Sequence, residues 1–106
     1  MTDTITTLYQ GQLPATNGSP LFTASSTYGA IVKSIILVNT GAATTFQLFK
    51  KGTAASNAIT PSWPIPANGM AQLSGETIGF ANGDTFYGVA GVASQVTCTV
   101  DGDVLS

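Results

Sequence analysis

The chain has 106 residues, which is enough for one domain that buries a core without disulfides or bound metals. Only 8% of its residues are charged, against about 25% in ordinary soluble domains, while 43% are hydrophobic. The three cations are lysines and the net charge is −2, so there is no basic patch to neutralise phosphates. This balance argues against nucleic acid as a partner and leaves a neutral surface that does little to oppose self-association.

The same sequence argues against membrane insertion and secretion. Its longest apolar run, residues 35–38, is far shorter than the roughly 20 residues that a membrane helix needs. The first residues lack the basic and then apolar order of a signal peptide. Cys98 is the only cysteine, so no disulfide within the chain can form. We therefore expect a protein made in the cytoplasm, without membrane contact.

Residues 1–20 are rich in Thr, Gly and Pro and are expected to form an N-terminal arm ahead of a β-sandwich domain at residues 21–106. One interpretation is a short edge strand at residues 4–9 followed by a surface loop. The other is that Tyr9 and Leu13 dock on a neighbouring subunit, because apolar side chains on a loose segment need a surface elsewhere. Both interpretations remain open at this stage.

The strongest strand signal lies at residues 31–38, which are rich in β-branched side chains and lie between Gly29 and the turn formers at residues 39–41. Four apolar residues in a row place oily groups on both faces, so this strand should be central and covered on both sides. Residues 20–24 predict a short strand, and residues 44–48 alternate until Phe49 breaks the pattern. Phe49 is either a cover for a sheet edge or an exposed contact.

Residues 52–66 hold three of the five prolines and the single tryptophan, which predicts an irregular loop or a broken edge strand. Trp63 is either a lid over the core or a rigid anchor at an interface, together with Ile65. The neighbouring Lys50 and Lys51 are expected to protect a strand edge with their charge.

Two Asn-Gly pairs, at residues 68–69 and 82–83, predict tight hairpin turns with antiparallel strands on either side. The expected strands are residues 70–74, 77–80, 84–89 and 95–101, and the alternation of the last places Cys98 in the core. Short strands at this spacing, without helical periodicity, predict an all-β fold, an antiparallel β-sandwich of jelly-roll-like form.

Catalytic chemistry has little support. The chain has no histidine, and Cys98 therefore has no base to activate it. Asp101 and Asp103 are expected at a turn, where a calcium ion could sit if a third ligand approached, although the spacing is not that of an EF-hand. Solvated turn carboxylates are the favoured interpretation. We expect no enzyme, no catalytic residue, no bound metal and no cofactor.

The order of several segments resembles small virion proteins of tailed bacteriophages. The resemblance is carried by residues 8–14, 28–40, 45–49, 65–69 and 82–87. It implies a β-sandwich subunit of the virion that decorates or cements the capsid, located on the capsid surface, with the major capsid protein as its partner. It carries no catalytic residues, since such proteins act through their surfaces.

On this basis the expected function is that of a capsid decoration protein that binds the shell as a homo-oligomer, a trimer, and stabilises it. The expected subunit or capsid contacts are Tyr9, Leu13, Phe49, Trp63 and Ile65. A tail or fibre component is the alternative within the virion. A carbohydrate-binding module, with Trp63 and Tyr87 as a sugar platform, is the alternative from another class.

Overall fold

The computed structural model describes residues 3–16 and 18–105, apart from the side chains of residues 75 and 76. This part of the chain contains eight strands and one short 3-10 helix: β1 (Asp3–Gln12), β2 (Phe22–Thr23), β3 (Ala30–Asn39), β4 (Thr44–Lys50), η1 (Ala55–Asn57), β5 (Trp63–Ile65), β6 (Met70–Phe80), β7 (Thr85–Ala90) and β8 (Val96–Leu105).

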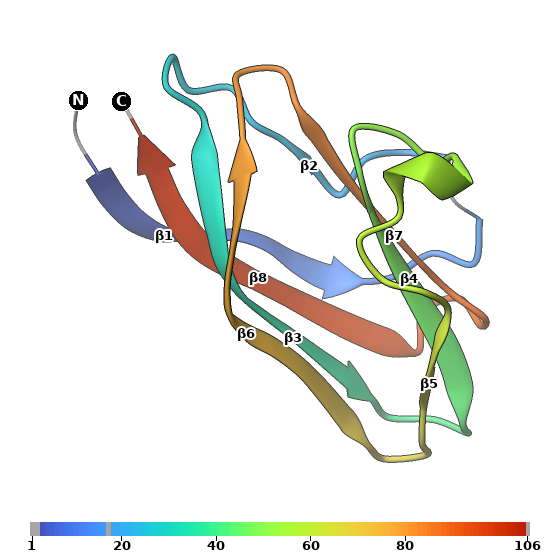
Figure 1. The fold of residues 1–106 in the computed structure, drawn as a ribbon. Coiled ribbons are helices and arrows are strands. Elements are labelled where there is room, and N and C mark those ends of the chain that lie inside the picture. The colour runs from blue at the N-terminus through green and yellow to red at the C-terminus, as the bar shows by residue number, and fades with distance from the viewer. Residues whose placement is uncertain (1–2, 17, 106) are drawn as a thin grey trace.

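The strands form two antiparallel sheets of four, with the order β1-β8-β3-β6 in the first sheet and β2-β7-β4-β5 in the second (Figure 1). Consecutive strands alternate between the sheets except for β4 and β5, which are neighbours in the second sheet. Eight strands in these two orders make a jelly roll. The predicted all-β antiparallel sandwich is therefore confirmed.

The core lies between the inner faces of the two sheets. In β3 the inner side chains Val32, Ile35 and Leu37 are buried, and β3 is central because β8 and β6 flank it. Their neighbours Ile36 and Val38 face outward, and Val38 is 37% exposed. The strand is thus central as predicted, but within the chain only its inner face is covered.

The N-terminal segment is built into the first sheet. Residues 3–12 form β1, which pairs antiparallel with β8 from one end to the other, with a register shift between Thr7 and Tyr9. The edge-strand interpretation is confirmed, over a longer range than residues 4–9. Leu13 follows β1 and is 0% exposed, and its N–H donates to the carbonyl of Val96.

The Asn-Gly pairs make turns, but these turns do not join neighbouring strands of one sheet. Residues 68–69 lie between β5 of the second sheet and β6 of the first, and residues 82–83 lie between β6 and β7 of the second sheet. The hairpin prediction is therefore wrong. The left-handed φ angles of Asn68 and Gly83 indicate a reversal of the chain, and they are equally compatible with a step from one sheet to the other.

Two further strand predictions need correction. Residues 70–74 and 77–80 belong to a single strand, β6, whose pairing with β3 shifts register between Val32 and Ser34. Residues 101–103 lie inside β8 and not in a turn. A Cβ atom at Gly102 would overlap the carbonyl oxygen of Ile31 on β3, so glycine is needed there for close backbone approach.

One end of the sandwich is held by a buried amide. The Nδ2 of Asn39 donates to the carbonyls of Ala42, Ile65 and Pro66 at 2.9, 3.3 and 3.0 Å. Its Oδ1 accepts from the Gly41 N–H and from Gln95 Nε2, both at 3.0 Å. Asn39 is 0% exposed and thus ties the end of β3 to the turn before β4, to the end of β5 and to the turn before β8.

Candidate interaction surface

The outer face of the first sheet is rich in hydroxyl and amide groups. Directly paired residues share a face, so the register identifies the outer side chains row by row. One row runs Gln10, Thr99, Ile36 and Gln72 across the four strands, and the next runs Gln12, Thr97, Val38 and Met70. The side chains of these two rows are uncharged, and most of them can form hydrogen bonds with a partner.

The apolar part of this face lies at one end. Val38 and Met70 are register partners, and Met70 is 63% exposed. The half-buried Ile36 lies one outer row away on the same strand as Val38. Exposed apolar side chains that adjoin one another on a sheet are suited to burial against another protein.

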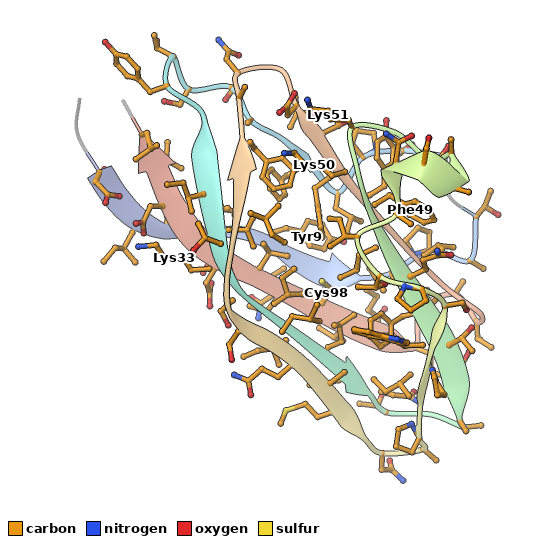
Figure 2. The ribbon with its side chains drawn as sticks, in the orientation of Figure 1. Tyr9, Lys33, Phe49, Lys50, Lys51 and Cys98 are labelled. Atoms are coloured by element: carbon orange, nitrogen blue, oxygen red, sulfur yellow. The ribbon has the colours of Figure 1, made fainter. Side chains whose placement is uncertain are left out.

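The charge on this face is collected at the other end. Lys33, labelled in Figure 2, places its Nζ 2.8 Å from Asp103 Oδ2. The Asp103 side chain is nearly fully buried. The hydrogen bond from Lys33 holds the pKa of Asp103 below its usual value, and the same bond raises the pKa of Lys33. Desolvation and a hydrogen bond with Asp103 raise the pKa of Asp3. Lys33 thus neutralises Asp103, while Asp3 and Asp101 leave this end of the face acidic.

The favoured interpretation of Asp101 and Asp103 as solvated turn residues is wrong, because both lie in β8, and the calcium alternative has no support either. The two carboxylates have separate partners, because Thr7 Oγ1 donates to Asp101 Oδ1 at 2.9 Å while Asp103 pairs with Lys33. Among residues 3–16 and 18–105, no three metal-ligating side chains form a group.

The edges of the two sheets differ. The first sheet ends in β1 and β6, strands of ten and eleven residues that each pair along one side only. The second sheet ends in β2, with two residues, and β5, with three residues that include Pro64. Long unpaired edges accept further strands, whereas short or proline-bearing edges do not. The open edges therefore belong to the first sheet.

Two pockets lie along the sides of the sandwich. The first, of about 210 Å³, is lined by residues of β1 and β2 and by Ser25 and Ser26, so hydroxyl groups surround an apolar floor. The second, of about 240 Å³, is lined by Trp63 of β5 and by Gln72, Leu73 and Ser74 of β6. Trp63 is 41% exposed there, and its ring lies edge-on to Phe46 at 6.1 Å between centroids.

Three of the five residues expected to contact a partner have buried side chains. Leu13 and Ile65 belong to the core and Phe49 is also buried, so these three are corrected as contact residues. Phe49 is itself covered, since Ala58, just after η1, bridges to it alongside β4. Tyr9 and Trp63 remain partly accessible, at the edges of the first and second sheet.

The structure also bears on the lysine prediction and the sugar-platform prediction. Lys50 ends β4, and its Nζ lies 5.3 Å from the ring centroid of Phe80, so its charge also packs against an aromatic ring of the core, while edge protection by the two lysines stays a prediction (Figure 2). Trp63 pairs with Phe46 on the inner face of the second sheet, while Tyr87 pairs with Phe49 on the outer face. Trp63 and Tyr87 therefore cannot form one platform.

Several surface residues were missed from sequence. Ile5 is 85% exposed on β1, and Met70 and Val38 form the apolar end of the outer face. Their signal is an apolar residue at an outward position of a strand, which becomes visible only when the inner set of the same strand is known. The open space at Gly79 was missed for the same reason, since it too follows from the outward position of this residue. A Cβ atom at Gly79 would meet nothing within 4 Å.

The remaining chemistry is structural. Cys98 is buried in the core, as predicted, and desolvation raises the pKa of its thiol to about 12. Such a thiol is a poor nucleophile at neutral pH. No helix in the described ranges is long and apolar enough to cross a membrane.

Comparisons with known proteins give no relative from which a function could be inferred. No protein-family model, no curated protein and no solved structure matches this chain.

Proposed function

We propose that this protein is a structural subunit of a bacteriophage virion, a capsid decoration protein that binds the major capsid protein as a trimer and stabilises the shell. The observation that supports this most directly is the outer face of the first sheet, which is rich in hydroxyl and amide groups, is apolar at Val38 and Met70, and carries its charges at the opposite end. The resemblance of residues 28–40 and 82–87 to small virion proteins points the same way.

Attachment of this kind follows from multivalency. Each copy offers hydroxyl and amide groups and a few apolar side chains, so a single contact is modest. Copies tied into one oligomer share the cost of association, so that several modest contacts sum to slow release. Because Lys33 and Asp103 neutralise each other, such binding should depend only weakly on salt.

The test is rebinding to capsids assembled without this protein. Purified protein should bind expanded, undecorated capsids in high salt, as measured by co-sedimentation. The variant Thr97→Lys adds a charge to the apolar end of the outer face, beside Val38, so it should bind more weakly, whereas Val92→Lys in the exposed turn after β7 should bind normally. Capsids that stay bare with the wild-type protein would rule out this function.

A tail or fibre role would use the same surface at another place in the particle. Gold labelling of the protein in intact virions separates the two: label over the whole shell supports decoration, and label confined to the tail supports the tail role.

A saccharide-binding role is the second candidate from another class, favoured by the Trp63 pocket. An exposed indole ring in a pocket at the sheet edge that Gln72, Leu73 and Ser74 also line suits one sugar ring, with stacking on its apolar face. A panel of soluble bacterial polysaccharides should then quench the fluorescence of this single tryptophan. The quenching should survive Tyr87→Ala, since Tyr87 faces away from the pocket. Unchanged fluorescence with every polysaccharide would exclude this role.

A further inference from the structure

We propose that copies of this protein join head to tail, with β1 of one copy pairing antiparallel beside β6 of the next. This inference deepens the proposed function, because it names how the subunits of the oligomer meet. It commits to a second copy of this chain as the partner of both open edges of the first sheet.

Strand direction is compatible with this pairing. Each neighbouring pair in the order β1-β8-β3-β6 is antiparallel, so β1 and β6 run in opposite directions at the two edges. A second copy in the same orientation therefore brings its β6 antiparallel to β1 of the first. The outer faces of both copies then form one continuous surface on the same side of the extended sheet.

The two edges are free to pair. Leu13 N–H donates to Val96, and backbone groups of a strand alternate in direction, so those of Gln10 and Gln12 point away from β8. β1 has no lysine or proline to block a further strand, and Asp3 at its start is its only charge. Natural proteins blunt such edges when they are to remain single.

The side chains at the two edges match when the rows of the sheet continue level from copy to copy. The row that begins at Ile5 runs through Asp103 and Ile31 and ends at Gly79. Ile5 of one copy thus comes opposite Gly79 of the next. Ile5 is 85% exposed, and Gly79 has open space where a side chain would be. The exposed side chain of Ile5 would therefore pack over the open space at Gly79 of the next copy.

Between Ile78 and Ser74, β6 has three residues, 75–77, that pair with no residue of β3, and the rows resume beyond this bulge. Thr7 comes opposite Ser74 and Gln10 opposite Gln72, which pairs hydroxyl with hydroxyl and amide with amide. On the inner side, Tyr9 comes opposite Leu73, at the mouth of the pocket that holds Trp63. The fluorescence of the only tryptophan should therefore change on assembly.

A head-to-tail interface has two different halves, so it closes into a ring or grows into a filament. A closed ring of three is the form that the proposed trimer requires. Pairing of β1 with β1 around a two-fold axis is the competing arrangement, and it leaves Gly79 without a role.

The first experiment measures the mass of purified variants by light scattering. Wild type should exceed the 10.8 kDa of one chain, while Ile5→Lys and Gly79→Lys should each fall to that mass. Val92→Lys, a matched change at an exposed apolar residue outside both edges, should keep the wild-type mass. The double variant Ile5→Lys/Gly79→Glu should regain it, because opposite charges then face each other across the interface.

The second experiment traps the interface and does not depend on how tightly the variants associate. Cys98 is sealed in the core, so Ile5→Cys and Gly79→Cys proteins mixed under mild oxidation should form a disulfide between positions 5 and 79, identified by peptide mass. A disulfide only between two copies of position 5, or a wild-type protein that stays at the mass of one chain, would overturn the proposal. These measurements use the protein alone, whereas capsid rebinding tests the proposed function, so the two can fail separately.

Discussion

The two sheets of the sandwich share one core but differ at their rims. The second sheet ends in strands of two and three residues, and the chain after η1 covers β4 through hydrogen bonds from Ile59 and Thr60 to the Leu48 carbonyl. The first sheet ends in strands of ten and eleven residues with free outer sides. The second sheet therefore has short edges that are closed to further strands, whereas the first sheet has two long edges that can still pair.

This difference shows how a chain with 8% charged residues can offer a selective surface. Exposed backbone groups, hydroxyls and a few apolar side chains can distinguish partners by strand geometry rather than by charge. The predictions below test which residues belong to the shared core and which belong to the open rim of the first sheet.

The largest effect is expected for Leu13→Ala. Leu13 is 0% exposed and lies where β1 leaves the first sheet, next to Gly88 of β7 in the second. Truncation of such a side chain costs about 2–5 kcal/mol of unfolding free energy. Urea unfolding followed by tryptophan fluorescence measures it, with Val92→Ala in the exposed turn after β7 as a control that should stay within about 0.5 kcal/mol. Equal effects of the two variants would contradict the burial of Leu13.

Asn39→Asp should come next. The carboxylate keeps the shape of the amide but cannot donate to the carbonyls of Ala42, Ile65 and Pro66. Buried groups left without a partner cost about 1–3 kcal/mol each, so the midpoint of thermal unfolding should fall clearly. Asn82→Ala, in the exposed turn before β7, serves as the control and should leave the midpoint nearly unchanged. A stable Asn39→Asp protein would show that the amide does not hold this end.

Two glycines of the first sheet should respond differently to alanine. At Gly102 the new Cβ would overlap the backbone of β3, so Gly102→Ala should lose about 1–3 kcal/mol. At Gly79 the Cβ would meet open space, and Gly79→Ala should be neutral or should gain a few tenths of a kcal/mol. Chemical denaturation of the two variants side by side compares the centre of the sheet with its rim. A similar loss in both would mean that the rim is as closely packed as the centre.

The smallest effect is expected in acid. Lys33 holds the pKa of Asp103 below its usual value of 3.8, so this pair stabilises the fold at neutral pH and is lost as the pH falls below 3.8. Asp103→Asn should be less stable than wild type at pH 7, and the gap should close in acid. Asp3 has a raised pKa, so its own contribution runs the opposite way. Thermal unfolding from neutral to acid pH measures the gap, and a gap that does not change would contradict the ion pair.

Periodicity identified the inner faces of the strands but not the connections between them. Alternation along residues 95–101 predicted the burial of Cys98, and the density of β-branched residues predicted the central position of β3. Turn residues indicate where the chain reverses, but the pairs at residues 68–69 and 82–83 do not specify which sheet receives the next strand. That choice depends on how the two sheets pack, which a local pattern does not contain.

Individual residues also show that a local pattern does not contain the packing of the sheets. Leu13 stands alone in a polar segment, so nothing nearby indicated that it reaches the core. Gly102 lies between two aspartates, a typical turn composition, yet it belongs to a strand because β3 passes too close for a side chain. Exposure at Ile5 and Met70 follows from register, which is a property of the sheet.

The pairing of Asp3 with Leu105 brings the beginning of β1 and the end of β8 side by side. A short peptide linker could therefore close the chain into a circle, and new ends could be opened in the exposed turn at residues 91–94. Such a permuted chain would keep both open edges of the first sheet. Peptides fused to its new ends would then project from the turn at residues 91–94.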